Sequence, residues 1–191
     1  LLTLILQLSL KNIAYRVIES LKDGLVYVKK SPVLTDAILL LTGTQVIMAM
    51  LGTLAPGFAD RILQIDIHDA SLFIIGPMVL GIIIGAIWTG VSGNKYKPTD
   101  LIKKGIIGAG FILITISIVV RLVRVPVFTW FYSNSFYLLP FVLFLFFLLG
   151  IFNSLLDVPA NSIIQHESSS DIRGRVYGIL TAAVGGIGIL P

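Results

Sequence analysis

The sequence contains no cysteine and only two histidines among its 191 residues. The absence of cysteine excludes disulfide frameworks, thiol nucleophiles and cysteine-based metal sites, and two histidines alone cannot form a histidine-rich zinc centre. Charged residues are also scarce: they make up 13% of the chain, whereas about 25% is usual for a globular domain. So few charges cannot cover a compact core in water. We therefore expect lipid to surround most of the chain.

Hydrophobic residues supply 56% of the chain and gather in long uncharged runs. A helix needs about 20 apolar residues to cross the hydrocarbon of a bilayer. Three runs reach that length, a fourth does so when it is extended past Arg121, and both ends of the chain are apolar. We predict an all-α integral membrane protein with four complete and two partial transmembrane helices, truncated at both ends. The uncharged runs are residues 37–59, 70–94, 105–120, 125–156 and 176–191.

This pattern divides the chain into three segments. We expect residues 1–10 to end a preceding transmembrane helix, residues 11–31 to form an amphipathic linker helix, and residues 32–191 to form a transmembrane bundle with an incomplete last helix. The linker has apolar residues near the helical period and charges on the opposite face, which favours a helix lying along the headgroups; packing against a soluble domain is the alternative. Ser31 and Pro32 predict an N-cap and a first helical position.

The 14 Lys and Arg residues are unevenly distributed between the two sides of the predicted bundle, with eleven on one side and three on the other. Because cytoplasmic loops are enriched in Lys and Arg, we expect residues 11–31, 95–104 and 173–175 to lie in the cytoplasm of a multi-pass cell-membrane protein. The net charge of +4 does not indicate nucleic acid binding, since the basic residues are spread over short loops and form no single basic face.

One predicted span carries polar residues at every fourth position. Such residues share one helical face, and inside a membrane they either contact another helix or face a watery cavity. Asp157 is the deepest acid of the chain; it either contacts substrate and exchanges protons, or holds helices together, and both interpretations stay open. We call this set the polar stripe; it consists of Asn153, Asp157, Asn161 and Gln165.

The first complete span offers Thr42 and Gln45 as further candidates for the same cavity. An interhelical hydrogen bond is the alternative for Gln45. Small residues elsewhere are spaced for close helix packing, because they let two backbones approach. These candidate packing residues are Gly81, Gly85, Gly178, Ala182 and Gly186.

Two neighbouring stretches carry a resemblance: DVPANSIIQ at residues 157–165 and DIRGRVYG at residues 171–178. They resemble the junction between the tenth and eleventh helices of major facilitator superfamily exporters, and the drug, macrolide and siderophore efflux branch is the most similar. The amphipathic linker, the helix start at Pro32 and the glycine-rich helix ending at Gly90 follow in the same order. The loop at residues 90–97 departs from the family, since it lacks the Asp-Arg core of the usual loop signature.

The resemblance implies that the chain is the C-terminal half of a secondary transporter whose N-terminal half is missing. Such transporters work by alternating access around a site near the bilayer midplane. Asp157 and Gln45 would then lie on helices that line this site. Arg173 and Arg175, with Gln165, would form a cytoplasmic gate; anchoring of the topology by positive charge is the alternative for the two arginines.

We therefore expect a secondary active transporter that exports a small amphipathic solute, coupled to proton entry. Its expected partners are the lipid bilayer, the solute, protons and the missing N-terminal half of the chain. We expect it to use no cofactor and no metal, and to have no enzymatic activity. Direction and coupling come from the resemblance alone. An uptake carrier or lipid flippase of the same fold is one alternative, and a noncatalytic membrane assembly or sensor protein is another.

Overall fold

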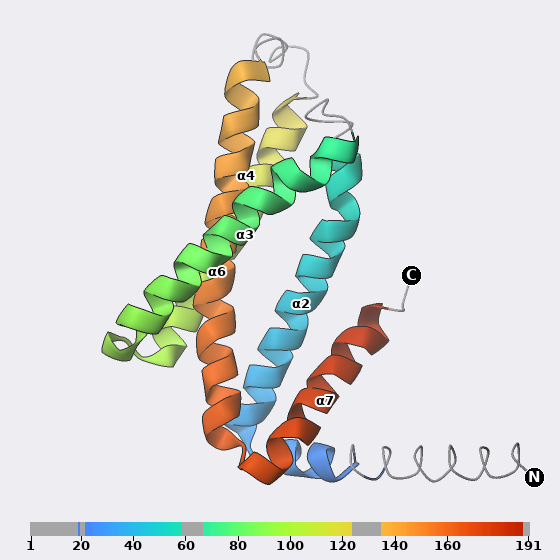
Figure 1. Cartoon of the computed structure of the whole chain (residues 1–191), viewed down its shortest axis with the longest axis vertical. Helices are drawn as coiled ribbons and strands as arrows, with labels where there is room; N and C mark the ends of the chain where they lie inside the picture. Colours follow the sequence, from blue (N-terminus) through green and yellow to red (C-terminus); the bar gives the residue numbers. More distant parts are fainter. Residues whose placement is uncertain (1–18, 20–21, 59–66, 124–134, 189–191) are drawn as a thin grey trace, which may run out of the picture. The chain divides into compact units, whose positions relative to one another are not determined.

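Figure 1 shows a computed structural model of the chain, which describes residue 19 and residues 22–58, 67–123 and 135–188. All regular structure within these residues is helical, as the sequence predicts. The helix expected at residues 1–10 and most of the first half of the linker lie outside the described residues. Helical residues 22–30 come first, followed by α2 (Pro32–Phe58), α3 (Ile67–Ser92), the short 3-10 helix η2 (Gly93–Lys95), α4 (Pro98–Val123), α6 (Ser135–Glu167) and α7 (Ser170–Gly188).

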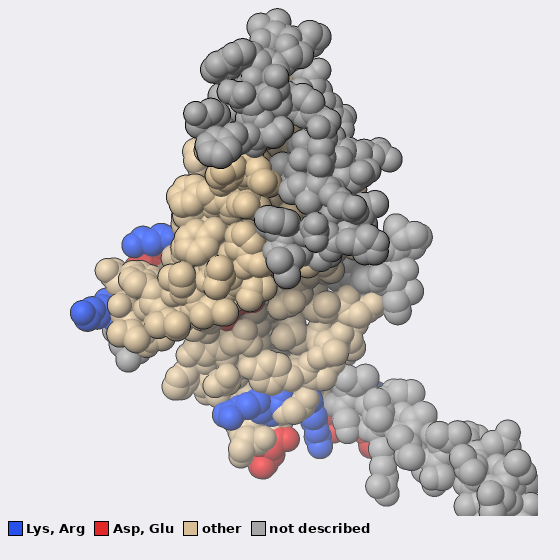
Figure 2. All heavy atoms as spheres, turned by 45° about the horizontal axis from the view of Figure 1, so that its top comes forward, with Lys and Arg blue, Asp and Glu red and all other residues tan. Residues whose placement is uncertain are grey.

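Four of these helices are long and apolar enough to cross a membrane, and they correspond to the four complete spans predicted from the sequence. Many large apolar side chains on them are exposed; Val91, Ile107 and Phe111 are 77%, 73% and 69% exposed. On the face drawn in Figure 2, most of the described surface carries no charge. Such a surface is favourable in lipid and unfavourable in water. The chain is therefore a helical membrane protein, with spans at Pro32–Phe58, Ile74–Ser92, Pro98–Leu122 and Leu138–Glu167.

Ser31 sets the start of α2 as predicted. The Oγ atom of Ser31 accepts a hydrogen bond from the backbone N–H of Leu34 at 3.3 Å, which is the N-cap geometry, and Pro32 takes the first helical position. The hydroxyl of Thr35 also donates to the carbonyl of Val28 at 2.9 Å. This bond joins the first turn of α2 to the helical residues that precede it.

The chain divides into two compact units that share two helices. One unit comprises Leu1–Val46 and Asn161–Pro191, and the other comprises Ile47–Ala160. Both α2 and α6 contribute one part to each unit. The first unit therefore contains residues 22–30, the start of α2, the end of α6 and α7, whereas the second contains α3, α4 and the remainder of α2 and α6.

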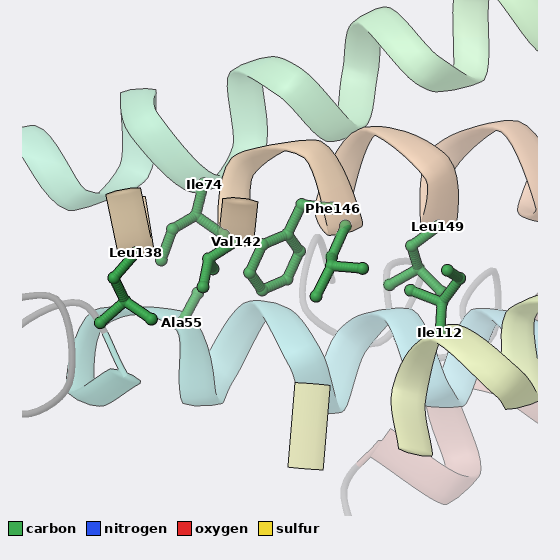
Figure 3. Packing of buried hydrophobic residues seen from close by; sticks show 8 residues of the cluster. Ala55, Ile74, Ile112, Leu138, Val142, Phe146 and Leu149 are labelled. Carbon is green, nitrogen blue, oxygen red and sulfur yellow. The ribbon is translucent and has the colours of Figure 1, made fainter. Parts of the chain in front are cut away.

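The second unit is built around α6, which lies among α2, α3 and α4 (Figure 3). Val142 and Leu149 of α6 are almost fully buried, and the Phe146 ring meets the Phe58 ring edge to face at 5.9 Å. The close packing of these side chains supplies the attraction between helices, since lipid removes most of the hydrophobic drive for helix association. The buried cluster consists of Ala55, Ile74, Ile112, Leu138, Val142, Leu145, Phe146 and Leu149.

Glycines lie where α3 and α4 approach α6 most closely. A Cβ atom on Gly81 would collide with the carbonyl oxygen of Phe147, and one on Gly150 would collide with the carbonyl oxygen of Met78. A Cβ on Gly105 of α4 would lie 2.9 Å from the carbonyl oxygen of a residue in α6. Only residues without a side chain allow helices to come this close.

Candidate functional site

The polar stripe lies along α6, and its exposure increases from one end to the other. Asn153 is buried with 6% of its surface exposed, Asp157 and Asn161 are half-buried, and the side chain of Gln165 is exposed. The division between the two units falls after Ala160, so the first two residues belong to the second unit and the last two to the first.

Asn153 and Asp157 are hydrogen-bonded to each other within the second unit. The Nδ2 atom of Asn153 donates to Oδ2 of Asp157 at 3.3 Å. Residues four apart face the same side of a helix, so the pair forms without help from another element. The pair places a carboxylate and an amide together in a helix apolar enough to cross a membrane, where each would be costly alone.

Asn161 contacts the next helix within the first unit. The hydroxyl of Tyr177 in α7 donates to Oδ1 of Asn161 at 3.2 Å. We did not predict a role for Tyr177, because the two residues are 16 positions apart and meet only when the chain folds back after α6. The stripe therefore contributes one contact within α6 and another between α6 and α7.

The predicted gate residues lie at the turn between α6 and α7. The Nη2 atom of Arg173 donates to the carbonyl oxygens of Gln165 at 3.0 Å and Ser168 at 3.3 Å. The Gln165 carbonyl lies in the last turn of α6 and Ser168 directly follows the helix, where helix carbonyls lack partners and the helix dipole favours a positive charge. Gln165 thus takes part through its backbone, while its side chain is exposed.

Arg175 connects the same turn to the linker. Its Nη1 atom lies 3.2 Å from Oδ2 of Asp23, and the hydroxyl of Tyr27 donates to the carbonyl of Glu167 at 2.9 Å. Gly24 lies between these contacts, where an added Cβ would be 3.2 Å from the Cβ of Arg175. Residues 22–30 are therefore attached to α6 and α7. No local pattern predicts the contacts of Asp23 or Tyr27, because their partners are distant in the chain.

The two candidates on α2 differ in their surroundings. The side chain of Gln45 is exposed, whereas Thr42 is buried at 7%. The Thr42 hydroxyl has no hydrogen-bond partner among the described residues. Helical threonines usually donate to a carbonyl one turn earlier, as Thr89 does to Gly85 at 2.8 Å. Thr42 and Thr89 are thus both buried, but in the described part of the chain only the Thr89 hydroxyl of these two is hydrogen-bonded.

The candidate packing residues fall into two groups. Gly81 and Gly85 lie at the approach of α3 to α6, where an added Cβ at the second would collide with the hydroxyl of Ser154. On α7, Gly178 is half-buried, Ala182 is exposed, and nothing described lies within 4 Å of a Cβ built on Gly186. The α3 pair therefore lies in close contact with another described helix, whereas Gly186 has open space around it.

Within the second unit, the pair of Asn153 and Asp157 offers amide and carboxylate atoms in an apolar helix, and atoms of this kind can hydrogen-bond a polar solute. Among the described residues, no three His, Asp or Glu side chains gather in a group that could hold a metal ion. Comparison with protein-family models, with curated proteins and with solved structures finds no match to this chain.

Proposed function

We propose that this chain is the C-terminal half of a secondary active transporter of the major facilitator type, located in the cell membrane. It exports a small amphipathic solute by alternating access, driven by proton entry, without a cofactor and without a covalent step. The observation that carries the proposal is the hydrogen-bonded pair of Asn153 and Asp157 within an apolar spanning helix.

An acid within a spanning helix is costly, so its presence favours a functional role. Asp157 is half-buried, which leaves part of its side chain accessible, and Asn153 holds one of its oxygens at 3.3 Å. A carboxylate that is both positioned and accessible can bind a cationic or hydrogen-bonding solute. The carboxylate can also bind a proton when the solute leaves, which would couple proton entry to solute export.

The contacts around the α6–α7 turn support a role as a gate. Arg173 binds the carbonyl end of α6, and Arg175 binds Asp23 of the linker at 3.2 Å. Both contacts involve exposed side chains, so they can break and reform at modest cost. We assign both contacts to the closed state of the cytoplasmic side, in which Arg173 joins α7 to the end of α6 and Arg175 holds residues 22–30 against α7.

The test uses Asp157→Asn, which keeps the size of the side chain and removes its charge. We expect ethidium export from cells that produce the full-length protein to fall at least about tenfold, a loss of about 1.4 kcal/mol of transition-state stabilisation, while the amount of protein in the membrane is unchanged. Asp171→Asn is the matched control, because Asp171 is an exposed acid in the first turn of α7, and its export should remain normal.

Three results would count against the proposal. Unchanged export by Asp157→Asn would show that the carboxylate has no role in transport. A loss of protein from the membrane together with a loss of export would instead identify Asp157 as a structural contact, as in an assembly or sensor protein. A failure of inverted vesicles to accumulate ethidium would indicate an uptake carrier, because an exporter transports the solute into such vesicles.

A further inference from the structure

The turn between two spanning helices carries an unneutralised group of lysines. The α3–α4 connection and the first turns of α4 contain Lys95, Lys97, Lys103 and Lys104, and all four are exposed. None of them forms an ion pair within the described residues, and Asp100 is the one acid among them. In Figure 2 blue side chains project at the left edge, where this end of α3 and α4 lies in Figure 1.

One of these lysines contacts an aromatic ring, which is itself stacked on a second ring. The Nζ atom of Lys104 lies 5.2 Å from the centroid of the Tyr96 ring, within the range of a cation–π contact. Tyr96 stacks on Trp88 with a centroid separation of 6.0 Å and an interplanar angle of 29°. Tyr and Trp favour the level of the lipid headgroups, so the stacked pair indicates the depth at which the lysines lie.

Apolar side chains continue from this aromatic pair along both helices. Ile84 of α3, one turn before Trp88, is 51% exposed, and Ile107 of α4, one turn after Lys104, is 73% exposed. The same surface therefore presents apolar contacts for acyl chains and, at its end, ammonium groups for a phosphate. A soluble anion would contact only the ammonium groups and not the apolar side chains.

We propose that this surface, which we call the basic hairpin, binds the headgroup of an anionic phospholipid. The basic hairpin comprises Trp88, Tyr96 and the four lysines. The lysines contact the phosphate, the stacked rings fix the depth of the headgroup, and the acyl chains lie along the exposed apolar residues of α3 and α4. Anionic headgroups attract juxtamembrane lysines in this way. The proposal depends on the spanning helices and not on the transport function.

Native mass spectrometry of the full-length protein in a neutral detergent tests the basic hairpin, with phosphatidylglycerol and phosphatidylcholine as probes. The variant Lys103→Gln/Lys104→Gln should weaken phosphatidylglycerol binding about fivefold for each lysine removed, and leave phosphatidylcholine binding unchanged. The variant Lys103→Arg/Lys104→Arg should retain the affinity because it keeps the charge. Arg121→Gln is the control, since it removes an exposed charge at the opposite end of α4.

Equal weakening by Arg121→Gln would overturn the proposal, because it would show a response to net charge alone. Equal affinity of the unaltered protein for the two lipids would also overturn it. Displacement of the lipid by an equal concentration of glycerol phosphate would identify a free-phosphate site instead. Lysine methylation of the unaltered protein gives an independent measurement: Lys103 and Lys104 should be protected in phosphatidylglycerol nanodiscs, and equal labelling in phosphatidylcholine nanodiscs would contradict the site.

Discussion

The guanidinium group of Arg175 lies 3.2 Å from the carboxylate of Asp23, a residue 152 positions earlier in the chain. The two side chains are 43% and 60% exposed. An ion pair in such a position gains little energy, because water screens it and both long side chains lose freedom. The pair therefore indicates where residues 22–30 attach, and the tighter contact at Gly24 fixes how closely they approach α7.

Removing the charge of Arg175 should change stability only slightly. We expect Arg175→Gln to lower the free energy of unfolding by less than about 1 kcal/mol, and 1 M salt should abolish the difference from the unaltered protein. The measurement is unfolding followed by tryptophan fluorescence in detergent, at low and at high salt. A larger loss that persists in 1 M salt would mean that Arg175 acts through packing instead of charge.

A disulfide should form between Gly24 and Arg175 when both are replaced by cysteine. A Cβ on Gly24 would lie 3.2 Å from the Cβ of Arg175 and 2.8 Å from the flexible end of Ile179, so a small outward shift brings the pair into the range of about 3.5–4.5 Å found in disulfides. The chain has no cysteine of its own, so any cross-link comes from the introduced pair. We expect Gly24→Cys/Arg175→Cys to cross-link under mild oxidation, as detected by the mass of intact protein after thiol blocking.

The same cross-link tests the proposed gate. Export of ethidium should stop when the disulfide forms and return when it is reduced, because the closed contact could no longer open. Each single cysteine variant is the control, and its export should not respond to oxidant. Full export by the cross-linked protein would show that the linker stays attached to α7 throughout the cycle.

The approach of α3 to α6 should not tolerate an added methyl group. Gly81→Ala would place a Cβ against the carbonyl of Phe147, so we expect a loss of about 1–3 kcal/mol, the usual cost of overpacking. Gly76→Ala on the same helix meets nothing within 4 Å and should leave stability equal or slightly higher. Thermal unfolding of both variants in detergent makes the comparison, and equal midpoints would refute the close contact.

Thr42 should respond to loss of its hydroxyl differently from Thr89. Both are buried, but the Thr89 hydroxyl donates to Gly85 at 2.8 Å and that of Thr42 has no partner among the described residues. We expect Thr42→Val to leave stability unchanged or raise it by about 1 kcal/mol, and Thr89→Val to lower it by about 0.5–1.5 kcal/mol. Chemical unfolding in detergent measures both. A clear loss for Thr42→Val would mean that its hydroxyl has a partner in the native protein.

The helices could be predicted from the sequence because hydropathy and capping are local properties. The four apolar runs became spanning helices, and the Ser31–Pro32 pair gave the start of α2 through the bond from Leu34 at 3.3 Å. The polar stripe likewise predicted that this span continues past Asp157 to Gln165, and α6 ends at Glu167. The spacing of four also predicted that Asn153 and Asp157 share a face, where they are hydrogen-bonded.

The contacts between distant segments could not be predicted in the same way. Tyr177 meets Asn161, and Tyr27 meets the carbonyl of Glu167, only because the chain turns back after α6. The spacing of residues along one helix does not show which other helix they will contact. For the same reason Gly81 and Gly186 look alike in sequence, although Gly81 lies against α6 and Gly186 has nothing described within 4 Å.

The glycine contacts also determine how α3 and α6 can move. Carbonyl oxygens of one helix rest against bare α-carbons of the other at Gly81 and at Gly150, with no layer of side chains between them. Side chains can change rotamer and absorb a small displacement, but two backbones in direct contact cannot. A displacement of α6 would therefore move α3 with it, and the two helices would rotate together as one rigid body.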